Sequence, residues 1–402
     1  MKPVVVISPY NVANFPEGGG HFWVYMQYAQ GLRQLGCEVY WMENFRSSGE
    51  LEQDALALAA FQAKMDRFGF AGKLILYLTS GKSPQEGPSE YIGMTQAEAE
   101  AIFERADLLL NFHYAIAPAL LARFRRTAMV DIDPGLLQFW ISRRQLSVAR
   151  HDYYFTTGET VGTPTARFPD CGLDWIHVPP AVCLERWPYT FDARAKAFTT
   201  VSSWDGGDWI VDGKEVYENT KRMSFLQFAD LPRQTEQTIE LALFLRTEQD
   251  AADRRLMESH GWRIRASREL TKTPELYQSY IQASRGEFSC AKPSCLKFQN
   301  AWVSDRTLCY LASGKPVVVQ HTGPSSFLPD HKGMFRFSTM KEAAVALAAI
   351  NADYEGNCRA ARQIAELYFD AKKVLGKILS CALKPAGARV ASSMSPTLSV
   401  HS

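Results

Sequence analysis

Residues 284–288 read SRGEF, and residues 304–319 read SDRTLCYLASGKPVVV. The first stretch predicts a Gly-Glu turn. The second predicts a short amphipathic helix, a Gly-Lys-Pro break and a buried apolar strand. This order brings a carboxylate, a basic side chain and a helix start around one crevice. Carboxylates accept hydrogen bonds from hydroxyls, and basic groups and helix starts attract phosphate, so the crevice is suited to a ligand that carries both.

The length and composition predict two soluble globular domains. The chain has 402 residues, which is more than one ordinary hydrophobic core contains. Apolar residues make up 46% and charged residues 22%, as is usual for globular proteins. The 44 basic and 43 acidic residues leave a net charge of +1. We therefore expect no general attraction to nucleic acid or to an anionic membrane.

The cysteines and the apolar runs indicate a cytoplasmic protein. None of the eight cysteines forms a Cys-x-x-Cys pair, so we expect free, mostly buried thiols and no bound metal. The N-terminal apolar run is too short for a signal peptide. No later run reaches the roughly 18 apolar residues that a membrane span needs.

The N-terminal half alternates predicted strands and helices. Buried strands are predicted at residues 3–7, 38–42, 74–78, 107–112, 127–132 and 152–157, from short apolar runs rich in β-branched residues. Helices are predicted at residues 22–35, 96–105 and 116–126. A glycine loop, Gly18–Gly20, separates the first strand from the first helix, which is typical of a βαβ unit.

The C-terminal half follows the same logic after a Pro- and Trp-rich connection at residues 166–192. Strands are predicted at residues 197–202, 238–245, 262–266 and 316–319, and helices at 221–228, 251–260, 273–283, 341–350 and 357–379, with a loop at 205–218. We therefore predict an α/β fold of two facing Rossmann-like domains, 1–190 and 191–384, with a disordered tail at 385–402. Ligands should bind in the cleft, at the carboxyl ends of the strands.

Two places in the chain resemble the glycosyltransferases of the GT-B fold. The first is the Gly18–His21 loop with a following helix that ends in LGCEV at residues 35–39. The second is Gly286–Phe288 together with LASGKPVV at residues 311–318, which looks like the donor-binding signature of the C-terminal domain. The resemblance implies a sugar nucleotide in the C-terminal domain and an acceptor in the N-terminal domain.

The chain departs from the retaining GT-B pattern at one position. Many of these enzymes carry a pair of glutamates, and the second of them falls here on Cys309. A thiol does not accept hydrogen bonds from ribose hydroxyls as a carboxylate does. Asp305, one helical turn earlier, can substitute for the missing carboxylate. Retention and inversion of the sugar both stay open.

Donor contacts are predicted at strand ends and helix starts of the second domain. Glu287 is expected to accept hydrogen bonds from sugar hydroxyls, with a turn or capping role as the alternative. Lys221 and Lys292 can neutralise a diphosphate, although a lysine is often only a surface residue. Asp305 and Arg306 open a helix whose start can bind phosphate, or serve only as its cap. The predicted donor set is Ser203, Lys221, Glu287, Phe288, Lys292, Asp305, Arg306, Thr322 and Gly323.

The N-terminal domain supplies a second set of candidates. Gly19 and Gly20 can let the backbone approach a diphosphate or an acceptor closely, or can form a merely flexible loop, and His21 can simply start the next helix. The loop lacks the Gly-x-Gly-x-x-Gly spacing, which disfavours a dinucleotide cofactor. His113 follows a strand and can hydrogen-bond the sugar or acceptor. Asp133 follows another and can act as a general base, with a Pro-Gly turn as the plain alternative.

Asp131 and Asp133 have the Asp-x-Asp spelling of a metal site, but we interpret them as a strand end. Residues 80–95 and 136–150 are expected to contact the acceptor. The aromatic residues there, Tyr91, Phe139 and Trp140, can stack on a sugar or an aromatic aglycone, or can equally belong to the core.

The sequence therefore favours a glycosyltransferase, an enzyme that moves a sugar from a nucleoside-diphosphate sugar to an unidentified acceptor. The acceptor can be a small molecule, a glycan or a lipid-linked group, and no cofactor or metal is expected. A nucleotide-sugar epimerase of the same fold is one alternative. A degenerate, non-catalytic sugar-nucleotide-binding protein is another, and Cys309 is its best support.

Overall fold

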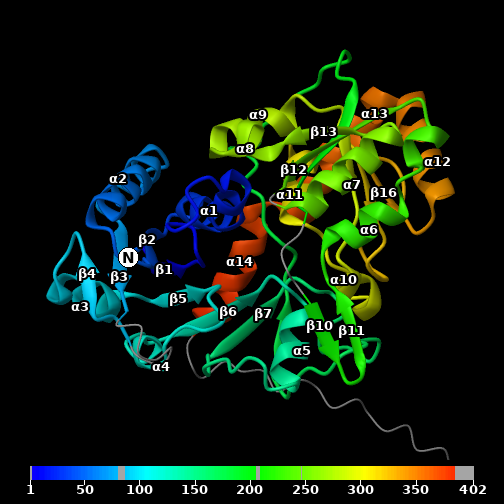
Figure 1. The fold of residues 1–402 in the computed structure, drawn as a ribbon. Helices are drawn as coiled ribbons and strands as arrows, with labels where there is room; N and C mark the ends of the chain where they lie inside the picture. The colour runs from blue at the N-terminus through cyan, green and yellow to red at the C-terminus, as the bar shows by residue number, and fades with distance from the viewer. Residues whose placement is uncertain (1, 80–86, 205–208, 246, 385–402) are drawn as a thin grey trace, which may run out of the picture.

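The computed structural model describes residues 2–79, 87–204, 209–245 and 247–384. Two sheets, each with helices on its faces, form two lobes that lie side by side (Figure 1). This is the predicted α/β architecture of two Rossmann-like domains. The predicted disordered tail at 385–402 and part of the predicted acceptor loop at 80–95 lie outside the described residues.

The first sheet has eight strands in the order β4-β3-β2-β1-β5-β6-β7-β8. They are β1 Val4–Ser8, β2 Glu38–Asn44, β3 Leu74–Leu78, β4 Glu90–Ile92, β5 Leu108–Asn111, β6 Thr127–Asp131, β7 Tyr153–Thr156 and β8 Trp175–His177. All neighbours are parallel except β3 and β4. Val5 of the central strand β1 pairs with Val39 and Leu108 and is fully buried, because helices cover both faces of a parallel sheet.

The helices of the first domain are α1 Gly19–Gln34, α2 Leu51–Arg67, α3 Gln96–Arg105, α4 Pro118–Leu121 and α5 Leu136–Ser142. Helix α3 has the predicted bounds, and a capping box between Thr95 and Glu98 fixes its start. The helix predicted at 116–126 is reduced to the single turn α4. Strand β6 begins at Thr127, so the residues before it are needed for the connection.

The second sheet has six parallel strands in the order β13-β12-β9-β14-β15-β16. They are β9 Ala197–Ser203, β12 Thr238–Phe244, β13 Arg263–Ala266, β14 Gly286–Ser289, β15 Val317–Gln320 and β16 Met334–Phe337. A separate antiparallel hairpin, β10 Trp209–Asp212 and β11 Glu215–Glu218, corrects the loop predicted at 205–218. Gly213, with φ +64°, allows its tight turn. Residues 205–208 of the predicted loop lie outside the described residues.

The helices of the second half are α6 Lys221–Gln227, α7 Glu248–Ser259, α8 Ser267–Thr271, α9 Pro274–Gln282, α10 Pro293–Phe298, α11 Asp305–Ala312, α12 Met340–Ala352, α13 Tyr354–Ile364 and α14 Ala371–Ala382, with a 3-10 turn at Leu231–Gln234. The long helix predicted at 357–379 is broken. A π-helical turn at Ala365–Phe369 ends the first part, and the Asp370 side chain accepts a hydrogen bond from the Lys372 amide and starts α14.

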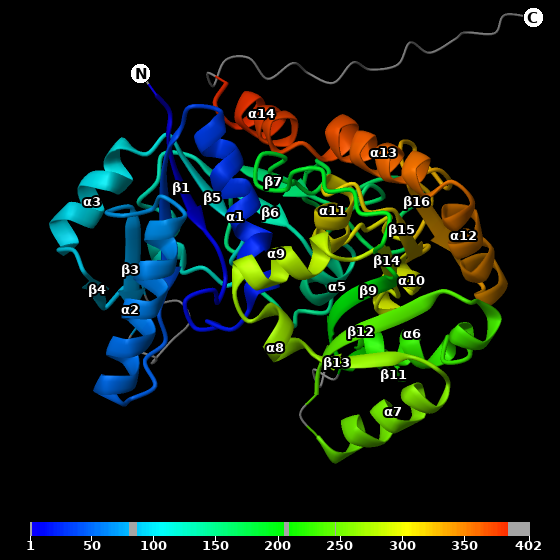
Figure 2. The same ribbon diagram turned by 90° about the horizontal axis from the view of Figure 1, so that it is seen from above.

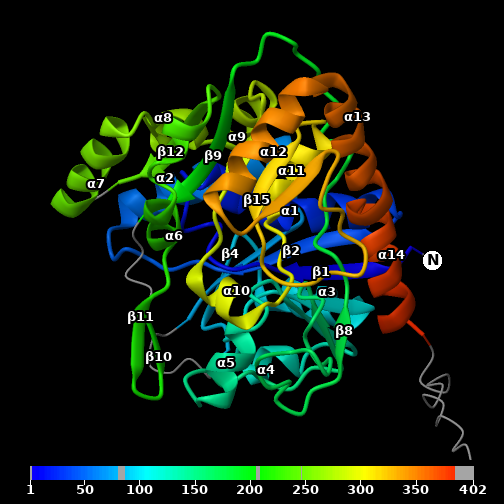
Figure 3. The ribbon, with the colours of Figure 1, turned by 90° about the vertical axis from the view of Figure 1, so that its right-hand side faces the viewer.

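Helix α14 crosses back to the first domain, although its sequence belongs to the second half. It packs against α1, as Figures 2 and 3 show near the N-terminus. The contact is close at Gly31, where an added Cβ would lie 2.5 Å from Leu375 Cδ1 and 2.7 Å from Ala371 Cβ. The C-terminal helix therefore ties the two domains together.

The carboxyl ends of both sheets meet the region between the domains. Asp133 follows β6 of the first sheet, while Ser203 and Phe244 end β9 and β12 of the second, and all three line one cavity. No helix in the described ranges is long and apolar enough to cross a membrane.

The α1–α14 contact predicts that alanine substitutions at two glycines change the free energy of unfolding in opposite directions. Gly31→Ala should lower the free energy of unfolding by about 1 kcal/mol, because the new methyl group overpacks against Leu375 and Ala371. Gly376→Ala, on α14 with no atom near the new methyl group, should raise it by roughly 0.5–1 kcal/mol through helix propensity. Denaturant unfolding measures both, and equal shifts of the same sign would contradict the α1–α14 packing.

Candidate functional site

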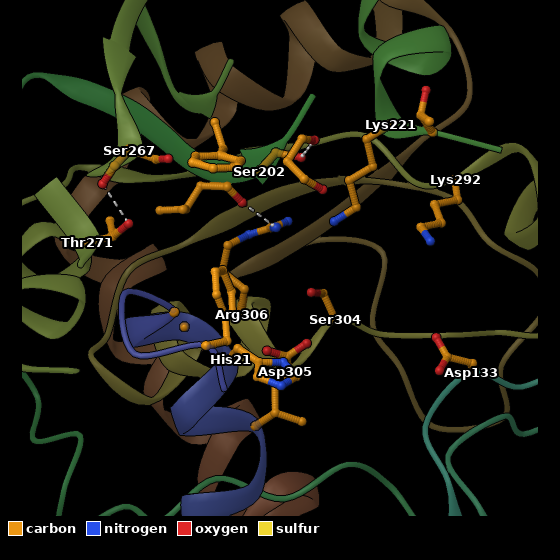
Figure 4. Close-up of a pocket in the computed structure, with 18 of the residues that line it drawn as sticks. His21, Asp133, Ser202, Lys221, Ser267, Thr271, Lys292, Ser304, Asp305 and Arg306 are labelled. Carbon is orange, nitrogen blue, oxygen red and sulfur yellow. Dashed lines mark hydrogen bonds between the residues drawn. The ribbon is translucent and has the colours of Figure 1, made fainter. Parts of the chain in front are cut away.

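A cavity of about 610 Å³ lies between the two domains. Its walls come from the start of α1, the ends of β9 and β12, and the starts of α6, α8 and α11 (Figure 4). The predicted residues that line it are Gly19, Gly20, His21, Asp133, Ser203, Lys221, Lys292, Asp305 and Arg306. We call this space the basic cavity, after its lysines and arginines.

Lys221 is the first residue of α6, and its amine points towards the guanidinium of Arg306 (Figure 4). Its Nζ lies 5.6 Å from the centroid of the Trp302 ring. Burial and the nearby positive charge of Arg306 together lower the pKa of Lys221 to about 7. An anion in the basic cavity would favour the charged lysine, so this side chain is suited to bind a phosphate.

Arg306 is held in place by three hydrogen bonds. Nε donates to Glu287 Oε1 at 2.8 Å, Nη1 to the Val201 carbonyl at 2.8 Å and Nη2 to Ser289 Oγ at 2.5 Å. Burial disfavours the charge of Arg306, but Glu287 together with Tyr277 and Tyr310 outweighs this effect, and the pKa of Arg306 is raised. A guanidinium has five N–H groups, so two are left for a ligand in the cavity.

Glu287 and Phe288 lie on opposite faces of β14, and neither lines the basic cavity. Glu287 is fully buried under α11, with one carboxylate oxygen on Arg306. Phe288 is fully buried in the core of the second domain, where it stacks on Phe337 with ring centroids 5.2 Å apart. Neither residue is therefore placed for the predicted direct contact with a donor in this cavity: Glu287 contacts Arg306 instead, and Phe288 is a core residue.

Thr322 and Gly323 also lie away from the basic cavity. The Thr322 hydroxyl donates to the Trp302 carbonyl at 2.7 Å. An added Cβ at Gly323 would lie 2.5 Å from the Gln299 carbonyl oxygen. Both residues hold the segment that carries Trp302, and Trp302 itself lines the cavity.

Gly19 and Gly20 are needed for a close contact between the domains. An added Cβ on Gly19 would lie 2.4 Å from the carbonyl oxygens of Thr271 and Thr273, and one on Gly20 would lie 2.8 Å from the Tyr277 ring. The glycines therefore let the start of α1 pack on α8 and α9 while they line the basic cavity. His21 Nε2 lies 2.7 Å from the Tyr10 carbonyl oxygen, and burial lowers the pKa of His21.

The start of α11 carries Asp305 into the basic cavity. The side chain of the preceding residue, Ser304, makes no capping hydrogen bond and also lines the cavity. Cys309 is buried, and its thiol contacts the Asp305 carbonyl oxygen at 3.5 Å and Gln27 Nε2 at 3.6 Å. A molecule bound in the basic cavity can therefore contact the Asp305 carboxylate. The Cys309 thiol is buried and does not line the cavity.

A second cavity, of about 800 Å³, lies at the carboxyl edge of the first sheet. His113 lines it, with its ring 5.0 Å from that of Tyr10. Burial, together with the charge of Arg46, lowers the pKa of His113 to about 4, so the ring is neutral near pH 7. Asp133 lines both cavities and therefore marks the point where they adjoin.

Asp131 and Tyr114 fix the loop that carries Asp133. The Asp131 carboxylate is fully buried and accepts hydrogen bonds from Gln138 Nε2 at 2.9 Å, Thr156 Oγ1 at 2.8 Å and the Asp133 amide at 3.0 Å. Burial raises the pKa of Asp131 to about 7. Tyr114 Oη accepts from the Asp133 amide at 3.2 Å. Asp131 is thus a structural carboxylate at a strand end, as the sequence indicated.

Neither a protein-family model nor a curated protein matches the sequence. Solved structures do match. HepE from Anabaena in complex with UDP-glucose has a TM-score of 0.57 and 12% identity, over 94% of this chain and 99% of that chain. Sucrose-phosphate synthase from Thermosynechococcus elongatus has a TM-score of 0.53 and 12% identity, over 95% and 98%. The chain has the GT-B fold. The pneumococcal O-GlcNAc transferase GtfA, in complex with UDP and GlcNAc, agrees, with a TM-score of 0.56 and 10% identity over 95% and 98%.

The GT-B fold also brings residues to the basic cavity that sequence reasoning missed. They are Glu17, Asn219, Phe244, Ser267, Arg268, Thr271, Tyr277 and Trp302. Ser267 could have been found, because it follows β13 at the carboxyl end, where ligands of such sheets bind. Trp302 carries no such signal in the sequence.

The lowered pKa of Lys221 gives a prediction about stability and pH. Between pH 7 and the ordinary lysine pKa of 10.5, the unfolded chain keeps a proton on Lys221 that the folded protein releases. The free energy of unfolding should therefore rise with pH through this window, by up to about 1.4 kcal/mol per unit. Lys221→Met should remove this rise and be more stable than the wild type at pH 7 and below.

Unfolding curves measured from pH 6 to 10 would check this expectation. Lys297→Met is the matched control, because Lys297 is a half-exposed lysine paired with Glu215 outside the basic cavity. If both variants keep the slope of the wild type, the pKa of Lys221 is not lowered as described.

Proposed function

We propose that the protein is a glycosyltransferase that moves a sugar from a nucleoside-diphosphate sugar to an acceptor hydroxyl. The observation that carries this proposal is the pair of adjoining cavities. One presents Lys221, Lys292 and Arg306, and the other meets it at Asp133. Similar structures support it, since HepE and GtfA were solved with UDP-glucose and with UDP and GlcNAc.

In this proposal the basic cavity stabilises the leaving diphosphate. The bond between the anomeric carbon and the diphosphate oxygen breaks, and its electron pair leaves with the nucleoside diphosphate. The acceptor oxygen bonds to the anomeric carbon, and its proton passes to the Asp133 carboxylate. The charge that develops on the diphosphate is met by Lys221, Lys292 and Arg306 rather than by a metal ion or other cofactor.

Arg306 is preorganised for this role. Its three bonds to Glu287, Val201 and Ser289 hold the guanidinium before any ligand arrives. A donor that is already in place costs little reorganisation when charge develops, and this is the main source of electrostatic catalysis. Glu287 is therefore proposed as the positioning residue for Arg306.

The contact between the domains supports exclusion of water from the donor. Trp23 Nε1 donates to the Pro274 carbonyl at 2.9 Å, and Arg268 pairs with Glu17 at 2.7 Å across the basic cavity. Together with the close approach of Gly19 to α8 and α9, these contacts cover one side of the cavity. A covered site slows hydrolysis of an activated sugar.

The second cavity also bears on the alternatives. An epimerase changes one sugar in place and has no use for an adjoining space of about 800 Å³. A transferase needs such a space for its acceptor, so transfer is the better account. A non-catalytic sugar-nucleotide-binding protein would share the basic cavity and differs only in turnover.

A panel of sugar nucleotides tests the proposal. We expect one member to bind in calorimetry and to release free nucleoside diphosphate slowly in the absence of an acceptor. Conversion to an isomeric sugar nucleotide would show an epimerase instead. Binding with no turnover would show a non-catalytic protein, and no binding by any member would overturn the basic cavity as a donor site.

The ion pair beneath the cavity gives a second prediction. Glu287→Gln should lower donor turnover roughly 100-fold, because Arg306 loses the charged partner that holds its guanidinium in position to stabilise the diphosphate. The effect should fall mainly on kcat, because the charge of Arg306 matters most as the leaving group develops. Glu240→Gln is the matched control: Glu240 is a buried carboxylate on β12 of the same sheet, bonded to Tyr280 at 3.0 Å outside the basic cavity.

Thermal melts of both variants would show whether they stay folded. Turnover in a folded Glu287→Gln protein that equals that of Glu240→Gln would remove Glu287 from the mechanism.

A further inference from the structure

The second cavity has an aromatic wall. The rings of Tyr10, Tyr25, Tyr77, Phe112, Tyr114 and Trp140 line it. They come from separate elements of the first domain: Tyr25 lies on α1, Tyr77 on β3 and Trp140 on α5, and the others follow β1 and β5. The basic cavity is lined by fewer such rings, those of Phe15, Phe244, Tyr277 and Trp302. We call this space the aromatic cavity.

We infer that the aromatic cavity binds the acceptor, and that the acceptor is a small planar aromatic alcohol, such as a phenol that carries a carbonyl group. This inference rests on the proposed function for its transfer step. Three observations carry it: the ring-lined wall, a buried amide donor without a partner among the described residues, and the position of Asp133.

Apart from Asp133, the ionisable groups that line the aromatic cavity are hydrogen-bonded or neutral. Arg46 is exposed, and its Nη2 donates to Tyr10 Oη at 3.0 Å. Glu43 is almost fully buried. Its Oε1 accepts hydrogen bonds from the Val12 and Ala13 amides, and its Oε2 accepts from Trp41 Nε1 at 2.9 Å. His113 is neutral near pH 7. A ligand with many charges would therefore have few free charged partners here besides Arg46, and losing its water without gaining partners costs free energy.

One polar atom in the wall lacks a partner among the described residues. Asn44 Nδ2 is buried and makes no hydrogen bond. A carbonyl or ether oxygen on the ligand would satisfy this donor. An unmet amide in a ring-lined space therefore favours an aromatic body with an oxygen acceptor on it.

Asp133 sets the direction in which the acceptor lies. It lines both cavities, and Tyr114 Oη lies 3.3 Å from its Oδ2. The reacting hydroxyl must meet the sugar where the cavities adjoin, so it points to Asp133. The aromatic body then extends towards Asn44 and Tyr10, away from the diphosphate.

The size of the cavity agrees with a compact ligand. About 800 Å³ is within the range of sites that enclose a drug-sized molecule. Aromatic side chains supply offset and edge contacts to a planar ring, with a gain beyond that of buried area alone. A glycan or a lipid-linked acceptor is the competing choice, and the experiment below includes both.

Umbelliferone, a fluorescent phenol with a ring carbonyl, is the probe for the full chain. We expect it to bind, and to be glycosylated when the sugar nucleotide identified by the panel is added. Trp140→Ala and Tyr10→Ala should each weaken binding about tenfold, the effect of one lost stacking contact. Tyr10 is 43% exposed, so its removal carries little risk to the fold.

Trp209→Ala is the control, because Trp209 is 60% exposed on the β10–β11 hairpin and outside the aromatic cavity. It should bind umbelliferone as the wild type does. Asp133→Asn should fail to transfer sugar to umbelliferone.

The inference is overturned if umbelliferone does not bind, or if Trp140→Ala and Tyr10→Ala bind it as tightly as Trp209→Ala. It is also overturned if methyl glucoside, or polyprenyl phosphate in phosphatidylcholine vesicles, accepts the sugar while umbelliferone does not. In both cases the proposed function would still stand if a sugar nucleotide of the panel is turned over. Ring-dependent binding of umbelliferone in a protein that binds no sugar nucleotide would support the aromatic site and overturn its role in transfer.

Discussion

The buried ion pair between Arg306 and Glu287 joins the parts on which the basic cavity depends. Arg306 lies on α11, Glu287 on β14, and the third partner, the Val201 carbonyl, on β9. A charge as buried as that of Arg306 is costly to leave without a partner, because desolvation disfavours it strongly. The carboxylate beneath it therefore fixes α11 against the centre of the second sheet, and with it the position of Asp305 at the cavity wall.

Close packing between the domains supplies the second constraint. Gly19 and Gly20 let the start of α1 approach α8 and α9, and Gly31, further along the same helix, lets α14 approach from the other side. Helix α1 is thus held by both the middle and the end of the second half of the chain. This arrangement keeps the basic and aromatic cavities adjoining at Asp133, which is what transfer between two substrates requires.

Local patterns predicted much of the fold. Strand β3 and helix α3 have the predicted bounds, since an apolar run and a capping box are both read within a few residues. Helix α2 was missed because few of its side chains are buried, which leaves a weak apolar face. The β10–β11 hairpin was missed because it lies outside both sheets, among Gly and Asp residues that indicate a loop. The candidate site was also predicted only in part. Strand ends and helix starts indicated Lys221, Asp305 and Arg306, but nothing in the sequence indicated Trp302.

The sequence by itself determined the α/β class, much of the order of strands and helices, and the presence of a basic crevice at the helix starts. Those features depend on periodicity and on residues close together in the chain. Only the tertiary structure decided that Glu287 faces Arg306 rather than the cavity, that Asp133 lines two cavities, and that six rings from separate elements enclose one space. These depend on which face of a strand or helix is covered by elements far away in the sequence, and that is settled only when the whole chain packs.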